Sequence, residues 1–205
     1  MTNTSVSAFG LNCSLKGTDD GSSSTQLLLG EVFQALGAQG VSSLGIERVV
    51  DHHVRYGITD DAGDGDGWPR LLEQVMAADI VVLGTPIWMG HPASPAQLVQ
   101  ERLNATMTET DDDGRPVLFG KVAVVAVVGN EDGAHHTSAE LFQGLNDLGF
   151  TIPAQGVTYW VGEAMHGVDY QDLPDGSDKT RATTATVAAN AAHLARLLRA
   201  GNYPA

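Results

Sequence analysis

The chain has 205 residues, of which 42% are hydrophobic, and it carries a formal net charge of −14 and a single cysteine, Cys13. One cysteine excludes an intramolecular disulfide and a cysteine-ligated iron–sulfur cluster. The negative charge disfavours nucleic acid and anionic membrane surfaces as partners, and no apolar run reaches the about 18 residues of a membrane span. Residues 1–5 lack the basic and apolar regions of a signal peptide. We therefore expect a cytoplasmic protein of one domain, residues 1–205, with a small-molecule partner.

Five apolar segments rich in β-branched residues predict strands, and each ends in a loop of small or polar residues. Continuous apolar runs are typical of parallel strands that are covered on both faces. The run at 122–128 is the most apolar, whereas the second segment is more polar and is expected nearer the edge of the sheet. The predicted strands are residues 6–11, 46–50, 80–83, 122–128 and 156–160.

Helical periodicity lies between these segments. Ser24 is a suitable N-cap for the first helix, Pro69 suits the first turn of the second, and Gly149 is the expected C′ glycine of the fourth. The predicted helices are residues 25–36, 68–77, 95–105, 138–148 and 179–200. The acidic stretches 59–67 and 109–114 are interpreted as surface loops. In the first of them, no starting position places ligands at all the positions that an EF-hand calcium loop requires, so we interpret it as a solvated turn.

Strand and helix alternate along the whole chain. This order predicts an α/β fold in which right-handed crossovers join parallel strands into a three-layer, doubly wound sheet. Five strands in the order 2-1-3-4-5 make the flavodoxin-like arrangement. In such a sheet, ligands bind beyond the carboxyl ends of the strands where the strand order reverses, so the loops after strands one, three and four are the candidate site.

The loop after the first strand, residues 12–25, is dense in hydroxyl groups and opens a helix. Backbone N–H groups at a helix N-terminus and short hydroxyl donors suit a phosphate, and Lys16 adds a local positive charge. The alternative is a flexible loop in which Ser24 only caps the helix. The nucleotide P-loop and the dinucleotide G-x-G-x-x-G pattern are both absent. The candidate binding residues are Asn12, Ser14, Lys16, Ser23, Ser24 and Thr25.

The loop after the third strand, residues 84–94, mixes Gly and Pro with large apolar side chains. Such side chains offer the flat surface that an isoalloxazine ring requires, and glycine lets the backbone approach it closely. The alternative is that Trp88 closes the end of the sheet. The candidate residues here are Pro86, Ile87, Trp88, Met89 and Gly90.

The loop after the fourth strand places polar groups at the exit of a very apolar strand, where they suit the polar edge of a ring. The alternative is a helix N-terminus capped by Asp132. His135 and His136 are adjacent but have no matched third ligand in the sequence, so we expect no metal. The candidate residues are Gly129, Asn130, Glu131, Asp132, Gly133 and His136, the last as a possible proton donor.

These three loops resemble those of the NADPH-dependent FMN reductases, a branch of the flavodoxin-like proteins that includes quinone reductases. Cys13-Ser14-Leu15-Lys16 with Ser23-Ser24-Thr25 is similar to that family's Ser-Pro-Arg-Lys…Gly-Asn-Thr phosphate loop. Gly84-Thr85-Pro86-Ile87-Trp88-Met89-Gly90 is similar to its Thr-Pro-Ile-Tyr-Trp-Gly flavin loop, and residues 129–133 stand where its third flavin loop lies. The first loop departs from the pattern: it is longer, it has Lys16 where arginine is common, and it brings Asp19 and Asp20 near the phosphate position.

The resemblance implies FMN as cofactor, NAD(P)H as electron donor, and a quinone, a free flavin or another small molecule as acceptor. It assigns the phosphate to Ser14, Lys16, Ser24 and Thr25, the ring to residues 86–90, and the polar end of the ring to Asn130 and Gly133. A flavodoxin-like electron carrier and a non-redox interaction module on the same fold are the alternatives.

The segment that follows the fifth strand, from Tyr159 to His166, is too apolar for an ordinary loop. Two interpretations are open, because it can roof the flavin pocket or form a contact between subunits. The family resemblance implies a homodimer or a homotetramer, with the flavin site near the interface.

Overall fold

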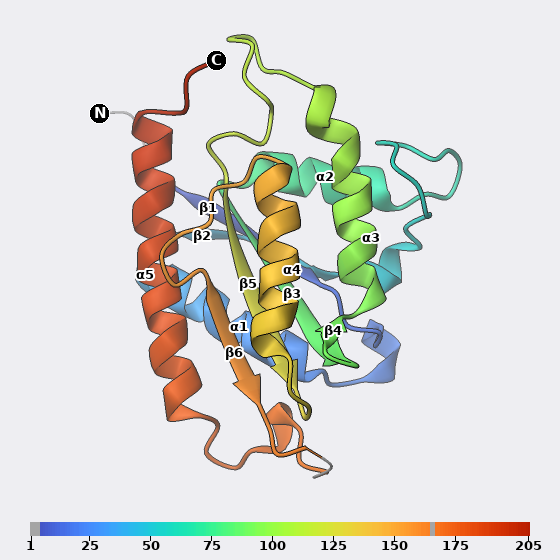
Figure 1. Ribbon diagram of the computed structural model, residues 1–205, viewed down its shortest axis with the longest axis vertical. Helices are drawn as coiled ribbons and strands as arrows, with labels where there is room; N and C mark the ends of the chain where they lie inside the picture. Colours follow the sequence, from blue (N-terminus) through green and yellow to red (C-terminus); the bar gives the residue numbers. More distant parts are fainter. Residues whose placement is uncertain (1–4, 165–166) are drawn as a thin grey trace.

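The computed structural model describes residues 5–164 and 167–205 (Figure 1). Its centre is a sheet of five parallel strands in the order β2-β1-β3-β5-β6, with a short β4 paired antiparallel to the end of β3. The predicted α/β class and strand order are therefore confirmed, and β4 is an addition to them. The strands are β1 (Ser7–Asn12), β2 (Ser42–Arg48), β3 (Ile80–Trp88), β4 (His91–Pro92), β5 (Val122–Gly129) and β6 (Val157–Val161).

Helices cover both faces of this sheet (Figure 1). One face packs on α1 (Ser24–Ala38) and α5 (Asp178–Ala200), and the other on α2 (Trp68–Ala77), α3 (Ser94–Leu103) and α4 (Ala134–Asp147). Each face of the sheet has its own hydrophobic core, and alternate residues of β5 pack into one or the other. Val125 and Val127 face the core under α2, α3 and α4, and Val124 and Val128 face the core under α1 and α5. Because both faces of β5 are buried, its sequence is continuously apolar.

Two predicted strand boundaries are wrong. The second strand, expected at 46–50, is β2 at Ser42–Arg48, and a 3-10 helix (Val49–His52) follows it. β2 is an edge strand with a largely exposed first half, so Ser42 and Ser43 carry no apolar signal. The third strand continues past residue 83 to Trp88, although it contains Pro86. Proline has no backbone N–H to donate to a neighbouring strand. β1 pairs with β3 only as far as Gly84, so no strand lies beside Pro86 on the β1 side and no hydrogen bond is lost there.

Some helix boundaries also shift. α1 begins at Ser24, with Ser23 rather than Ser24 as its N-cap, and α3 ends at Leu103 before a 3-10 helix (Asn104–Thr108). α4 begins at Ala134 rather than at residue 138, which places His135 and His136 on the helix instead of in the loop. Gly149 follows α4 with a φ of 112°, as a C′ glycine does.

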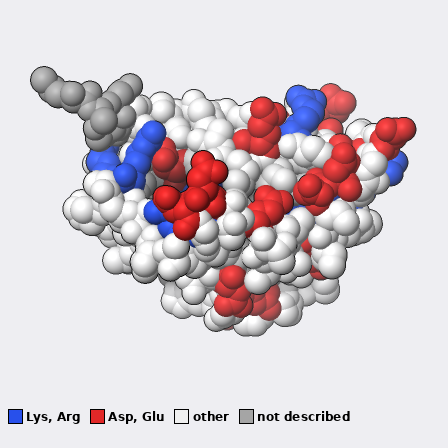
Figure 2. Space-filling model, turned by 90° about the horizontal axis from the view of Figure 1, so that it is seen from above, with Lys and Arg blue, Asp and Glu red and all other residues white. Residues whose placement is uncertain are grey.

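The acidic stretch 59–67 is not a fully solvated turn. The side chain of Asp66 is completely buried and forms an ion pair with the equally buried Arg102 of α3, with 2.7 Å between Nη2 and Oδ2. Carboxylates are nevertheless spread over much of the exposed surface. Figure 2 looks onto the end of the molecule that carries the amino ends of the strands, and acidic side chains outnumber basic ones there. In the described part of the chain, no helix is long and apolar enough to cross a membrane.

Gly84 is required where α1 crosses the sheet. A Cβ at this position would lie 2.7 Å from Cγ and Cδ1 of Leu29, inside a packed core. We expect Gly84→Ala to lower the free energy of unfolding by about 1–3 kcal/mol, the cost of overpacking, as measured by urea denaturation. Gly30→Ala is the matched control, since its Cβ would meet open space and should stabilise α1 by about 0.5–1 kcal/mol. A Gly84→Ala protein as stable as wild type would contradict the assigned packing.

Candidate functional site

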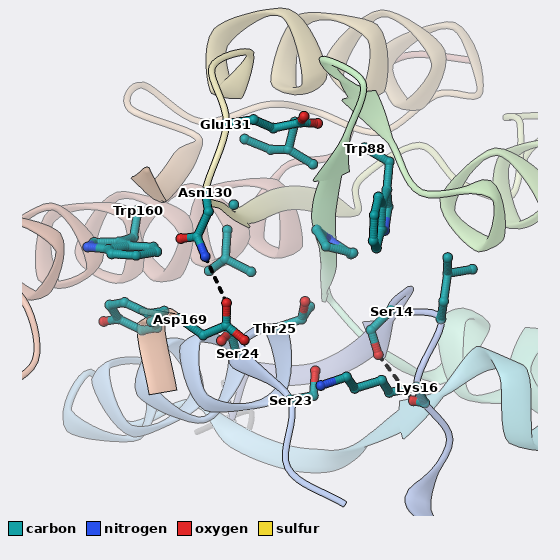
Figure 3. A pocket seen from close by; sticks show the side chains of 16 residues that line it. Ser14, Lys16, Ser23, Ser24, Thr25, Trp88, Asn130, Glu131, Trp160 and Asp169 are labelled. Carbon is teal, nitrogen blue, oxygen red and sulfur yellow. Dashed lines mark hydrogen bonds between the residues drawn. The ribbon is translucent and has the colours of Figure 1, made fainter. Parts of the chain in front are cut away.

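A cavity lies where the strand order reverses, beyond the carboxyl ends of β1, β3 and β5 (Figure 3). Its volume of about 360 Å³ falls within the roughly 300–1,000 Å³ typical of small-molecule sites. Most of the predicted residues line it, namely Ser14, Lys16, Ser23, Ser24, Thr25, Pro86, Ile87, Trp88, Gly129, Asn130 and Glu131. Four further lining residues were not predicted: Leu15, Val128, Asp169 and Tyr170. Trp160 also lines the cavity and belongs to the segment that was predicted either to roof it or to form a subunit contact.

One end of the cavity is built on the N-terminus of α1. Ser23 caps the helix, its Oγ accepting the backbone N–H of Gln26 at 3.4 Å. The first turn of a helix has backbone N–H groups without an intrahelical partner, and here it also presents the hydroxyls of Ser24 and Thr25. Lys16 extends alongside Ser23 in Figure 3. This end of the cavity therefore combines N–H donors, hydroxyls and one positive charge.

Asn12 was a candidate for ligand contact, but it lies behind the loop and is fully buried. Its Oδ1 accepts the backbone N–H of Ser14 at 2.9 Å, and its Nδ2 donates to Oε1 of Gln26 at 2.8 Å. Asn12 thus joins the start of the loop to the first turn of α1. Its role is to position Ser14 rather than to line the cavity.

The long first loop is held in place by two residues of the neighbouring edge. The guanidinium of Arg48 donates to the backbone carbonyls of Lys16, Gly17 and Gly21. Asp51 accepts both the N–H and the hydroxyl of Thr18. The hydroxyl hydrogen bond is the main cause that holds the pKa of Asp51 below its usual value. Several charge-assisted bonds therefore order a segment whose sequence alone suggests flexibility.

The two carboxylates of this loop, Asp19 and Asp20, lie outside the cavity. Asp20 turns back to accept the N–H of Gly17 at 2.8 Å, and neither Asp19 nor Asp20 lines the cavity. The two negative charges of this loop are consequently kept out of the wall beside Lys16.

Loss of the Arg48 guanidinium is expected to loosen this loop. In Arg48→Ala, three carbonyls lose a charged donor, so we expect faster amide hydrogen exchange over residues 16–22 and a loss of about 1–3 kcal/mol in unfolding free energy. Hydrogen-exchange mass spectrometry gives the first result and urea denaturation the second. Arg70→Ala, an exposed change on α2, serves as control. Unchanged exchange in 16–22 would show that Arg48 does not order the loop.

The opposite wall is apolar and comes from the ends of β3 and β5. Ile87, Trp88 and Val128 form it, and Trp88 is 52% exposed at the rim. Trp88 and Trp160 stand on opposite sides of the cavity in Figure 3. Gly129 keeps the slot open, because a Cβ there would lie 2.9 Å from Cβ of Ile87. The wall has the flat, apolar character that a ring ligand requires.

Met89 and Gly90 do not line the cavity. They form the two-residue turn between β3 and β4, with φ values of 53° and 77°, and positive φ at both positions is the signature of a type I′ hairpin. Met89 is 84% exposed at the tip. The turn is tied back to the third loop, because the N–H of Gly90 donates to Oε1 of Glu131 at 3.2 Å.

Three candidates of the third loop also lie outside the cavity lining: Asp132, Gly133 and His136. Gly133, rather than Asp132, is the N-cap of α4, with a φ of 125°. A Cβ at Gly133 would lie 2.8 Å from Cα of Gly90, so this glycine permits the hairpin to pack against the start of α4. His136 points to that hairpin, its Nδ1 lying 3.0 Å from the carbonyl oxygen of Gly90.

Sequence reasoning missed Asp169 and Tyr170, which precede α5 and reach the cavity from the chain's last third. The ring centroids of Trp160 and Tyr170 are 5.4 Å apart, and the Tyr170 hydroxyl donates to Oε2 of Glu31 at 2.5 Å. Burial raises the pKa of Tyr170 well above its usual range, and Glu31 reinforces the effect. A lone tyrosine between polar residues was the one signal available.

Asn130 stands between this segment and the slot. Its Nδ2 donates to Oδ1 of Asp169 at 2.8 Å, while its buried Oδ1 has no hydrogen-bond partner among the described residues. A buried acceptor without a partner costs free energy, and this oxygen is packed against Gly162, where a Cβ would clash with it. Trp160 lines the cavity, as the pocket-roof interpretation of residues 159–166 requires; Met165 and His166 lie outside the described residues.

A doubly wound sheet whose cavity joins a helix N-terminus rich in hydroxyls to a flat apolar slot is typical of a flavodoxin-like flavoprotein. The family model described as NADPH-dependent FMN reductase matches residues 7–165, and the chain belongs to that family. FMN is the cofactor of these proteins and NADPH their electron donor.

Two relatives are similar in sequence. The chain is 34% identical over 157 residues to 8-demethyl-8-aminoriboflavin-5'-phosphate synthase of Streptomyces davaonensis, covering 72% of this chain and 61% of that protein. It is 37% identical over 133 residues to the divalent metal cation transporter MntH of Mycobacterium bovis, covering 63% of this chain and 19% of that protein. The chain thus spans less than two thirds of the length of each.

Solved structures agree with the fold. The crystal structure of RosB with bound 8-demethyl-8-formylriboflavin-5'-phosphate superposes with a TM-score of 0.85 at 32% identity, over 97% of this chain and 82% of that one. A flavodoxin from the domain Archaea superposes with a TM-score of 0.59 at 11% identity, over 93% of this chain and 99% of that one. The second likeness concerns the fold alone.

Proposed function

We propose that this protein is an FMN-dependent NAD(P)H oxidoreductase that passes electrons to a quinone, a free flavin or another small acceptor. The observation that carries the proposal is the cavity itself, which has hydroxyls, helix N–H groups and Lys16 at one end and an apolar slot at the other. FMN has the matching shape, with a phosphate at one end and a flat ring at the other. Bound FMN supplies hydride acceptance and electron transfer.

The chain's own residues bind, orient and shield that group. Ser14, Lys16, Ser24 and Thr25 would hold the phosphate, and Ile87, Trp88 and Val128 would pack on the ring. Asn130 lies at the end of the slot, where its amide suits the polar edge of a flavin ring. Trp160 and Tyr170 close the side opposite Trp88 and keep water from it.

We further propose a location, a domain organisation and an oligomeric state for the protein. Residues 1–205 would act as one cytoplasmic FMN-binding domain, and a homodimer or homotetramer would form through the segment after β6. In that segment Val161 is exposed and Trp160 is partly buried, so a partner subunit could cover the roof of the cavity. Sedimentation equilibrium of wild type and of Val161→Asp tests the contact, since a charge in an apolar interface should dissociate it.

The test of the function is the visible spectrum of the purified protein mixed with FMN, first alone and then with anaerobic NADPH or NADH. Flavin bands that shift on binding and bleach with a nucleotide support the reductase and identify its donor. Shifted bands that bleach only with dithionite favour an electron carrier. An unshifted spectrum, with all FMN passing an ultrafiltration membrane, would contradict flavin binding and leave the non-redox module.

A second candidate is that a flavin phosphate is the substrate rather than a resident cofactor. Two similarities favour it. The chain is 34% identical to a protein named as a synthase of 8-demethyl-8-aminoriboflavin-5'-phosphate, and 32% identical to RosB, whose crystal structure contains 8-demethyl-8-formylriboflavin-5'-phosphate. Mass spectrometry of flavin recovered after aerobic incubation separates the two. An unchanged mass supports the reductase, whereas a change at the ring methyl groups supports flavin modification.

A further inference from the structure

Outside the cavity, three exposed side chains from two elements converge on one point. His91 lies on β4, and His136 and Glu140 lie one turn apart on α4. Oε1 of Glu140 is 3.0 Å from Nδ1 of His91 and 3.4 Å from Nε2 of His136. The two imidazole rings meet edge to face, with centroids 4.8 Å apart.

Two of the three distances between these atoms match a tetrahedral metal site. Zinc bonds of about 2.0–2.1 Å to nitrogen and oxygen place neighbouring ligand atoms roughly 3.3 Å apart in a tetrahedron. The two measured edges of 3.0 Å and 3.4 Å bracket that value. All three ligand atoms lie within 4.8 Å of one another, so a rotation of exposed side chains is enough to close the third edge.

The hydrogen bonding of His136 orients it as a ligand. Its Nδ1 lies 3.0 Å from the carbonyl oxygen of Gly90, which can only accept, so Nδ1 carries the proton. In the neutral ring, Nε2 then presents a lone pair toward the carboxylate of Glu140. Two acceptors that face each other repel unless a proton or a metal cation lies between them. An imidazole N–H on a backbone carbonyl is also the usual support of a metal-bound histidine.

We propose that His91, His136 and Glu140 bind one divalent cation of the zinc class, with water in the fourth position. Two imidazoles and one carboxylate are a ligand set that zinc uses. The overall charge of −14 favours cation binding at an exposed site. The cation would fasten β4 to α4, and with it the hairpin that begins at Trp88. From the sequence we expected no metal, because His135 and His136 had no matched third ligand. The proposed site combines His136 with His91 and Glu140, and it leaves out His135, which packs edge to face on Tyr159.

The test is a zinc titration of tag-free, EDTA-treated protein in competition with a chromophoric chelator. Wild type should bind one Zn²⁺. His91→Ala, His136→Ala and Glu140→Gln should each bind at least about tenfold more weakly, because even residues that only support metal ligands are worth roughly 10- to 100-fold. His135→Ala, the neighbour outside the cluster, and His193→Ala on α5 are the matched controls and should bind as wild type does. Far-ultraviolet circular dichroism establishes that every variant is folded.

X-ray absorption at the zinc edge supplies the second readout. Wild type should show nitrogen and oxygen neighbours at about 2.0–2.1 Å with imidazole scattering beyond them, and this pattern should disappear in His136→Ala. Two outcomes overturn the proposal. One is the absence of saturable one-to-one binding in wild type, which leaves a hydrogen-bonded cluster only. The other is equal affinity in wild type, His136→Ala and Glu140→Gln, which places the cation elsewhere. Neither outcome depends on flavin binding.

Discussion

Replacing Arg102 with alanine is expected to lower the free energy of unfolding by about 3–5 kcal/mol, because it leaves the carboxylate of Asp66 buried without its charged partner. Both side chains are completely buried. The guanidinium also donates to the backbone carbonyls of Thr59 at 2.9 Å and Arg55 at 2.7 Å, so one residue fastens α3 to the whole segment before α2. A loss of this size is a large share of the about 5–15 kcal/mol that stabilises a typical domain.

Urea denaturation of wild type and Arg102→Ala checks this prediction. Arg115→Ala is the matched control, because Arg115 pairs with Asp111 and Asp113 at the surface and its loss should change stability by no more than about 1 kcal/mol. Arg102→Lys should recover only part of the loss, since an ammonium cannot reach the carboxylate and two carbonyls in the same fork. Equal losses in Arg102→Ala and Arg115→Ala would show that the buried pair contributes no more than a surface pair.

The same site predicts how stability depends on pH. Burial alone would raise the pKa of Asp66, but the hydrogen bond from Arg102 and those from the backbone N–H groups of Ala62, Arg55 and Trp68 outweigh it and hold the pKa well below its usual value. A carboxylate with a depressed pKa in the folded state contributes stability above its unfolded pKa, about 3.9, and loses it as the pH falls toward the folded value. The stability difference between wild type and Arg102→Ala should therefore shrink below about pH 4.

The ion pair also shows where sequence reasoning ends. The run at 122–128 is continuously apolar because both its faces are buried, so a local pattern was enough to predict β5. The order of the sheet was predicted from the alternation of strands and helices and the strand count of the flavodoxin-like fold. Asp66 and Arg102 are 36 residues apart, and no local pattern distinguishes this aspartate from its solvated neighbours. The acidic composition of 59–67 therefore predicted a surface turn correctly for most of the stretch and wrongly for the residue that anchors it.

The candidate site divides along the same line. Topology brings residues at or just after the carboxyl end of a strand to the same edge of the sheet. Ser14, Trp88 and Asn130 were therefore found without any contact information. Asp169 and Tyr170 reach the cavity only because the chain returns between β6 and α5. Met89 was placed on the ring because a hairpin turn after β3 was not recognised, and the turn points it into solvent.

The phosphate end of the site gives the prediction with the largest effect on binding. Ser24→Asp is expected to weaken FMN binding by roughly 30- to 1,000-fold, or about 2–4 kcal/mol, because a carboxylate would face a phosphate of charge about −1.5 to −2. Ser24 lines the cavity at the first position of α1, and its Oγ accepts the N–H of Gln171 at 3.3 Å. Aspartate can keep that hydrogen bond and is favoured by the helix dipole, so the fold should lose no stability.

Riboflavin separates charge repulsion from damage to the site. It has the same ring as FMN and no phosphate, so Ser24→Asp should bind it as wild type does. Fluorescence titrations with both flavins at one fixed salt concentration measure the two affinities, since screening would otherwise change the repulsion. Thr186→Asp adds the same charge on the exposed side of α5 and should leave both affinities unchanged.

If FMN binds Ser24→Asp as tightly as wild type, the phosphate does not lie at the N-terminus of α1. If the affinities for FMN and riboflavin fall equally, the substitution has distorted the ring slot. Only a larger loss of affinity for FMN than for riboflavin assigns Ser24 to the phosphate.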